Sequence, residues 1–385
     1  FPFACTNYPN HPEYLKIVRR EVEGIVRRTR RHPSVVVYCG GNEYNPFINK
    51  HIISIILNKV NSLAPNIHCF KASPFSGDDH NWRVFGKGPL LRAFDINYSG
   101  PFKMLTEFGV QAAPNIETLR TCLEDGELDG NISTLKDELQ YHKADIDCLS
   151  KFGKKFSRDI EDIPSLIEIS QAIQAYTLKY AIEACRAGWP NVSGVFPWQL
   201  SDPWPNISWS IIDYNLKPKL ASKFVKKAYQ PILPTIRTWR RVRGRKNIRE
   251  GDLVVQNATQ DKFAGKLDVM VLEGDNNKRN LISSKQYNII VSPERTLKAS
   301  TIKVENKKDL LVRIHLYDNK GNLKASNFHF PSMEPNFSLK THIYDTINAR
   351  FDGWWRKYLI KLMELEKQRE EYRLWEKLRV ERENT

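Results

Sequence analysis

Two glutamates follow directly after short apolar runs, at positions where carboxylates could do chemistry. Glu43 follows the run Ser34–Cys39 and the pair Gly40–Gly41, and Glu107 follows the run Phe102–Leu105. Continuous apolar runs are typical of strands covered on both faces, as in parallel sheets. The carboxyl ends of such strands meet at one edge of the sheet, where two carboxylates can act on a glycosidic bond as an acid and a nucleophile. The pair therefore predicts a glycosidase site in a (β/α) barrel.

Helices and strands that would position these glutamates alternate over residues 1–230. A helix is expected to begin at Pro12, where proline suits the first turn, and to end at His32-Pro33. The further elements are a helix over 52–63, a strand over 66–72, a polar loop over 76–82, a helix opening at Pro114, an irregular loop with short helices over 124–158, a long helix from Ile163-Pro164 and a strand over 192–200. This alternation indicates an α/β barrel.

The pattern changes after Pro231. Short alternating runs lie between residues 252 and 317 and are separated by turn residues, which is typical of an immunoglobulin-like β-sandwich. The highly charged segment Ala349–Thr385 carries aromatic residues and leucines near helical spacing, so we expect a helix that pairs with another helix or docks on the sandwich. We therefore predict a partial TIM barrel, with about strands three to eight, at 1–230, a sandwich at 231–335 and a charged helical tail at 336–385.

Composition restricts the partners and cofactors. The net charge of +15 raises the alternative of a nucleic-acid-binding protein, but the one basic cluster, Arg237–Arg249, holds no zinc-finger spacing or RNP-like motif. The six cysteines form no CxxC pair, which argues against a zinc site and a disulfide scaffold. No window of 18 apolar residues occurs, so we expect no membrane span. Compartment and oligomeric state stay open.

Three segments of the chain resemble a known family. His32–Glu43 resembles the acid/base segment of glycoside hydrolase family 2, nearest to its β-mannosidase-like members, and Thr106–Pro114 resembles the nucleophile segment of that group. Trp198–Tyr214 resembles the last barrel strand and the loop that follows it. Three such segments in the right order are far more specific than a lone Asn-Glu pair. The resemblance implies a C-terminal fragment that begins near the end of barrel strand three and lacks the family's N-terminal domains.

The resemblance also implies roles for individual residues. Glu107 would attack the anomeric carbon while Glu43 serves as acid and then base, without a metal or organic cofactor, so Glu107 must stay ionised while Glu43 keeps its proton. Substrate-binding roles are implied for Asn42, His80, Trp82, Trp198 and Asp202. Plainer roles stay open for several of these residues: a turn former for the asparagine, a core side chain for Trp198 and a loop cap for the aspartate. Tyr98 could support the nucleophile or simply pack.

The substrate is less certain than the chemistry. The expected substrate is an oligosaccharide or glycoside with a terminal β-linked sugar, most closely a β-mannoside. Tyr44-Asn45-Pro46 is not the commonest β-mannosidase continuation, so β-glucosaminidase or β-galactosidase specificity stays open. A catalytically silent carbohydrate-binding relative is a further alternative, although both glutamates are present. The isolated fragment is expected to have little activity, because a partial barrel leaves strand edges and the pocket open.

Overall fold

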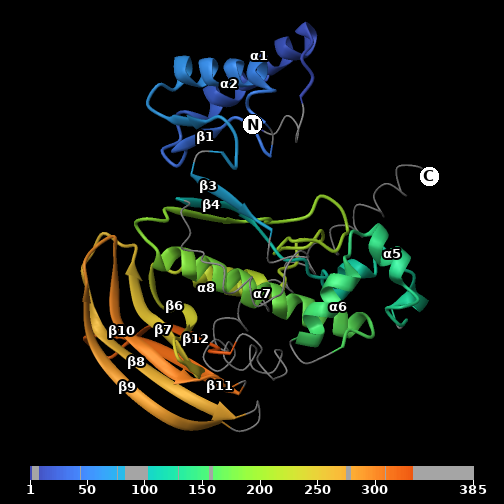
Figure 1. The fold of residues 1–385 in the computed structure, drawn as a ribbon. Coiled ribbons are helices and arrows are strands. Elements are labelled where there is room, and N and C mark those ends of the chain that lie inside the picture. Colours follow the sequence, from blue (N-terminus) through green and yellow to red (C-terminus); the bar gives the residue numbers. More distant parts are fainter. Residues whose placement is uncertain are drawn as a thin grey trace, which may run out of the picture. The chain divides into compact units, whose positions relative to one another are not determined.

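The computed structural model describes residues 1, 8–43, 45–75, 77–82, 103–128, 130–155, 159–274, 279–307 and 309–332 (Figure 1). All of them belong to one compact unit, Phe1–Asn336. Tyr98, Tyr44, the start of the strand expected at Phe102 and the helix expected over 349–385 lie outside the described residues. The predictions made for those positions therefore stay predictions.

A short parallel ladder with two helices opens the chain. Strand β1 (Val37–Cys39) pairs in parallel with β2 (His68–Phe70), and helices α1 (Pro12–Thr29) and α2 (Lys50–Leu63) share an apolar cluster with them. Helix α1 begins where the sequence predicts, because Pro12 occupies its first turn and the side chain of His11 accepts a hydrogen bond from the Tyr14 N–H. The two strands place the segment that carries Glu43 at their carboxyl ends.

A second parallel ladder runs in the order β3–β4–β5, with bounds β3 (Asp78–Asn81), β4 (Met104–Phe108) and β5 (Gly194–Pro197). Strand β3 corrects the prediction of a polar loop over 76–82. The sequence Asp-Asp-His-Asn has low strand propensity, but its backbone pairs with β4 from Asp78 opposite Met104 to Asn81 opposite Phe108. A bridge between Asn42 and Ser73 places the segment after β1 beside the segment after β2.

Helices follow β4 in the chain. The segment expected to hold short helices contains a 3-10 turn, η1 (Asp125–Glu127), and helices α5 (Lys136–Tyr141) and α6 (Ile146–Lys155), after the one-turn α4 (Ile116–Leu119). The long α7 (Ile163–Ala187) begins with a capping box between Asp162 and Ser165 and is buried on nearly all sides. It contacts α8 (Leu220–Ala228), β5 and the first strand of the next sheet. Within the described residues, no helix is long and apolar enough to cross a bilayer.

Two antiparallel sheets follow α8. One has the order β10–β7–β6 and the other β12–β11–β8–β9 (Figure 1). Their strands are β6 (Ile232–Val242), β7 (Arg245–Asn257), β8 (Phe263–Gly274), β9 (Arg279–Val291), β10 (Arg295–Glu305), β11 (Leu310–Asp318) and β12 (Leu323–His329). The five strands expected between 252 and 317 are present, and β6 and β12 are additional. The chain is therefore mixed α/β with substantial sheet content; a full TIM barrel and an immunoglobulin-like sandwich stay predictions.

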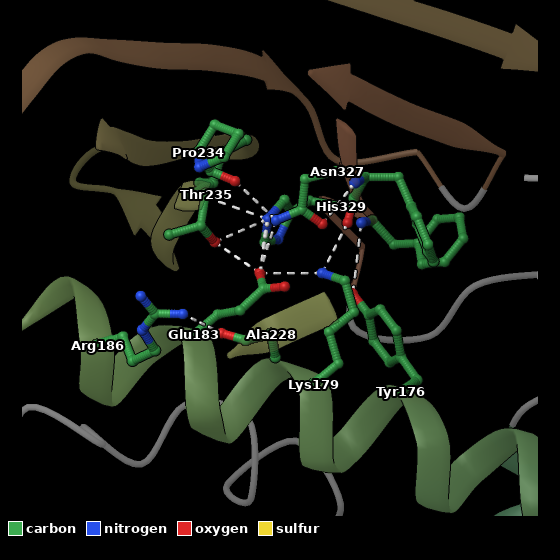
Figure 2. Close-up of polar contacts among 12 residues, drawn as sticks. Tyr176, Lys179, Glu183, Arg186, Ala228, Pro234, Thr235, Asn327 and His329 are labelled. Atoms are coloured by element: carbon green, nitrogen blue, oxygen red, sulfur yellow. Dashed lines mark hydrogen bonds and ion pairs between the residues drawn. The ribbon is translucent and has the colours of Figure 1, made fainter. Parts of the chain in front are cut away.

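A buried polar network joins α7 to the antiparallel sheets (Figure 2). Lys179 Nζ lies 3.0 Å from Glu183 Oε2, which also accepts hydrogen bonds from Thr235 Oγ1 at 2.7 Å and Asn327 Nδ2 at 2.9 Å. His329 lies beside the same carboxylate, with Nε2 at 3.3 Å from Oε2. The carboxylate of Glu183 therefore connects helix α7 to strands β6 and β12 of the antiparallel sheets.

Burial decides the charge states in this network. Burial is the largest influence on Glu183 and disfavours its charge, but the charge of Lys179 and the hydrogen bond from Thr235 work against it, and the pKa of Glu183 is lowered to about 2. Burial lowers the pKa of His329 to about 4, and Nε2 of that ring faces the N–H of Ile236 at 3.2 Å. Burial also lowers the pKa of Lys179, against the opposing charge of Glu183. The network therefore pairs a carboxylate with a lysine and holds a neutral imidazole near neutral pH.

Candidate active site

The two predicted glutamates lie together, with His80 between them. Glu43 follows β1, His80 lies in β3 and Glu107 lies in β4. His80 Nδ1 is 2.9 Å from Glu43 Oε1 and 3.8 Å from Glu107 Oε2. One carboxylate oxygen of each glutamate and a ring nitrogen of the histidine all lie within 4.8 Å of one another. Strands far apart in sequence therefore bring these three side chains to one point.

The backbone at Glu43 is held in an uncommon conformation. Its φ is +49°, in the left-handed region that non-glycine residues rarely adopt. Its N–H donates to the Ser73 carbonyl at 2.8 Å, and the Ser73 N–H donates to the Gly41 carbonyl at 3.0 Å. These two bonds fix the turn after Gly40-Gly41 against the segment that follows β2. A strained backbone held by its surroundings is a recurrent feature of functional sites.

Glu107 is the more enclosed carboxylate. Its side chain is 11% exposed, against 43% for Glu43. Burial raises the pKa of Glu107, and the charge of Glu43 adds to this, whereas the charge of His80 and a hydrogen bond from Trp82 oppose it. The sequence does not show how deeply a strand-end side chain is buried, and the expectation that Glu107 is the ionised member of the pair stays a prediction.

Trp198 and Gly109 lie close together, next to the strand that carries Glu107. The Trp198 N–H donates to the Phe108 carbonyl at 2.7 Å, and the indole-bearing residue is 42% exposed. A methyl group on Gly109 would overlap the Trp198 carbonyl oxygen and press on Trp209. Trp82 packs against Trp209 with ring centroids 5.7 Å apart. Trp198 is therefore partly open to solvent, while Trp82 contacts Glu107.

Asp202 is engaged within its own loop. Its carboxylate accepts hydrogen bonds from the hydroxyls of Ser208, at 2.5 Å, and Ser210, and from Gln199 Nε2 at 3.4 Å. With its amide in the satisfied orientation, Asn206 donates to both carboxylate oxygens at 3.0 and 3.2 Å. The residue is 8% exposed. This geometry favours the loop-capping role over a direct role in binding sugar.

Asn42 and the polar residues behind the site complete the arrangement. Asn42 is half-buried and forms the bridge with Ser73 described above. Ser73, Asp78 and Thr106 lie behind His80 and share a set of hydrogen bonds. The sequence analysis did not select these three residues. The one signal for Thr106 is its position directly before Glu107, while Ser73 and Asp78 resemble ordinary loop residues.

A metal ion is one use for such a group of side chains. In the described part of the chain, Glu43, His80 and Glu107 are the residues close enough to share a cation. The 2.9 Å separation of His80 Nδ1 and Glu43 Oε1 is that of a hydrogen bond. The geometry thus accounts for the histidine without a metal, and the expectation of a reaction that needs no cofactor stays a prediction.

Comparisons with known proteins place the chain among glycosidases. No family model matches. The chain is 30% identical over 278 residues to Beta-mannosidase B of Aspergillus flavus, which covers 62% of this chain and 32% of that protein, and 29% identical over the same length to the Emericella nidulans protein of that name. The chain therefore spans about a third of the length of these curated relatives.

Solved structures agree with the sequence comparison. The fold matches a β-D-mannosidase of Dictyoglomus thermophilum with a TM-score of 0.74 and 26% identity, covering 87% of this chain and 43% of that one. It also matches an exo-chitosanase of Amycolatopsis orientalis with a TM-score of 0.64 and 17% identity, covering 84% and 39%, a likeness of fold alone. Sequence and fold together support a β-mannosidase-like protein of glycoside hydrolase family 2.

Proposed function

We propose that this chain supplies both catalytic carboxylates of a retaining β-glycosidase, most closely a β-mannosidase. The observation that carries the proposal is the approach of Glu43 and Glu107, which each bring a carboxylate oxygen within 4.8 Å of the other. Retaining glycosidases hold their carboxyl groups about 5–5.5 Å apart, whereas inverting enzymes leave about 6.5–9.5 Å for a water molecule. The short separation favours a covalent intermediate over direct attack by water.

The two carboxylates differ in their surroundings in a way that suits different roles. Glu107 lies deep, where a hydrogen bond from Trp82 favours its ionised form. It attacks the anomeric carbon as the bond from that carbon to the glycosidic oxygen breaks. Glu43 is more open to solvent and gives its proton to the departing oxygen. In the second step Glu43 removes a proton from water, the water oxygen attacks the anomeric carbon, and Glu107 is released.

The fold supports this assignment at the level of domains. Both glutamates lie at the carboxyl ends of parallel strands, which is where barrel enzymes place their catalytic residues. We assign residues 1–230 to a TIM-barrel portion and residues 231–335 to an immunoglobulin-like sandwich. The buried network around Glu183 would then hold these two domains in one arrangement.

Substrate contacts are proposed for two side chains beside the carboxylates, and an indirect effect for a third. Asn42 precedes the acid and would bind the hydroxyl next to the anomeric carbon, an interaction that strengthens in the transition state. Trp198 exposes its ring and would stack on a sugar face. His80 contacts Glu43 directly, so its effect on substrate passes through the acid. A β-mannoside is the favoured substrate because the curated relatives and the matched solved structure with 26% identity are mannosidases.

A panel of nitrophenyl β-glycosides tests the proposal. The protein, expressed from its complete coding region, should hydrolyse the β-mannoside fastest. Glu43→Gln should lower kcat by about 10²–10⁴-fold with leaving groups that need a proton, the usual worth of general acid catalysis, and Glu107→Gln should abolish turnover. Glu161→Gln, a change at an exposed glutamate, is the matched control and should leave activity intact. No turnover of any sugar would contradict the proposal, and faster turnover of a β-glucosaminide or β-galactoside would correct its specificity.

A further inference from the structure

Asp78 receives hydrogen bonds from three directions. Its Oδ1 accepts the Phe75 N–H at 2.8 Å, and its Oδ2 lies 2.6 Å from Ser73 Oγ and 3.1 Å from Thr106 Oγ1. An ionised carboxylate only accepts hydrogen bonds, and hydroxyl bonds to it are short and strong. The 2.6 Å contact is therefore donated by the Ser73 hydroxyl, which commits its single proton to Asp78.

Ser73 Oγ has two further contacts, one with Thr106 Oγ1 at 3.0 Å and one with the imidazole of His80. Ser73 Oγ lies 3.0 Å from His80 Nε2, and the side chain of His80 is 5% exposed. Because the hydroxyl proton is committed to Asp78, the oxygen can only accept from the ring. Nε2 must therefore carry a proton. A neutral imidazole has one N–H, so Nδ1 is then bare and can only accept.

The bare nitrogen faces the acid. His80 Nδ1 is 2.9 Å from Glu43 Oε1, and the other charged group facing the ring is Glu107, at 3.8 Å from Nδ1. A bare Nδ1 makes a hydrogen bond with Glu43 only when that carboxyl group carries its proton. The opposite tautomer would donate from Nδ1 and would favour the ionised carboxylate. The tautomer of His80 thus bears on whether Glu43 holds the proton it must transfer.

We propose that Asp78 and Ser73 fix His80 in the tautomer protonated on Nε2, and that His80 in this form is a positioning residue that retains the proton of Glu43 for transfer to the leaving group. The proposal rests on the proposed function for the role of that proton. The tautomer itself can be measured without any substrate.

The tautomer is read directly from the ¹⁵N shifts of the imidazole ring. The chain has nine histidines, so His80→Gln identifies the resonances of this ring. The wild-type protein should show a neutral ring protonated on Nε2. Ser73→Ala and Asp78→Asn should convert part of the population to the Nδ1-protonated form, and Ser73→Thr, which keeps the hydroxyl, should restore the original form. Ser193→Ala is the matched control, since it removes a hydroxyl that bonds the Lys103 carbonyl rather than Ser73, Asp78 or His80, and it should leave the tautomer unchanged.

Three NMR results would overturn the proposal: a wild-type ring protonated on Nδ1 alone, a wild-type ring protonated on both nitrogens, or a Ser73→Ala ring with the wild-type pattern. The Ser73→Ala variant removes a single oxygen atom, so it keeps the test open even where Asp78→Asn does not fold.

A comparison of two leaving groups tests whether His80 helps Glu43 to keep the proton that it transfers. General acid catalysis is worth about 10²–10⁴-fold, so Ser73→Ala should lower kcat/KM by roughly tenfold or more for an alkyl β-glycoside, which needs a proton on departure. A dinitrophenyl β-glycoside leaves without a proton and should lose far less. Equal losses on both substrates would refute the role of His80 in retaining the proton. If the wild-type protein hydrolyses no glycoside, the proposed function fails while the NMR result still stands on its own.

Discussion

Replacing Lys179 with methionine should destabilise the protein far more than an average substitution. Lys179 and Glu183 are one helical turn apart in α7, with side chains 5% and 3% exposed. The ammonium also donates to the backbone carbonyl of Phe328 at 3.0 Å and lies 5.0 Å from the centre of the Phe328 ring. Figure 2 shows Lys179 paired with Glu183. Methionine fills a similar volume but leaves the Glu183 carboxylate buried without its cation.

The expected magnitude follows from the pKa of Glu183. A fall from 4.5 to about 2 corresponds to roughly 3 kcal/mol of preferential stabilisation of the carboxylate. Breaking a buried ion pair by removing one partner costs about 3–5 kcal/mol in other proteins. Because the charge of Lys179 is the largest of the influences that favour the carboxylate, Lys179→Met should cost about 3 kcal/mol, which corresponds to a fall in Tm of several degrees.

Chemical denaturation followed by tryptophan fluorescence and circular dichroism measures this cost. Lys226→Met, at an exposed lysine of α8, is the matched control and should stay within about 0.5 kcal/mol of the parent. The double variant Lys179→Met/Glu183→Gln should be more stable than the sum of the single changes predicts, because it no longer buries a lone charge. A cost below about 1 kcal/mol for Lys179→Met, or no coupling in the cycle, would refute the reasoning.

Three further outcomes are expected. His329 has a pKa of about 4 when folded against 6.5 when unfolded, so its contribution of roughly 3 kcal/mol is present above pH 6.5 and lost as pH falls toward 4; His329→Gln should flatten the measured stability over that window. Trp82→Phe removes a hydrogen bond that lowers the pKa of Glu107, so the acid limb of the kcat/KM profile should move to higher pH, and an unmoved limb would contradict the contact. Gly109→Ala should weaken binding of glycosides and lower Tm because its methyl overlaps the backbone carbonyl beside it, whereas Gly24→Ala, with open space around it, should not.

The alternation of elements was predictable because local pattern decides it. Pro12 and the capping residue Asp162 mark helix starts that local chemistry favours. The placement of Glu43 and Glu107 after apolar runs was enough to predict that they meet, since parallel strands end at one edge. Strand β3 was missed because its residues have low strand propensity, and pairing with β4 makes it a strand.

The finer parts of the site depend on contacts that sequence spacing does not show. Ser73 and Asp78 look like loop residues in the sequence. Their place in the site follows from the hydrogen bonds that link them to His80, which lies in a strand that was itself unexpected. Asp202 looked equally able to bind sugar or cap a loop, and its hydroxyl donors lie six and eight residues later. Lys179 and Glu183 carried a weak signal, as an i,i+4 pair of opposite charge inside an apolar helix.

Trapping of the glycosyl–enzyme is the most direct test of the central claim. A β-mannoside with fluorine beside the anomeric carbon and a good leaving group should inactivate the protein expressed from its complete coding region. Mass spectrometry of the digested protein should then find one sugar attached to the peptide that carries Glu107, and Glu43→Gln should still accumulate this adduct when the leaving group needs no proton. An adduct on Glu43, or turnover with inverted configuration and no adduct, would contradict the account.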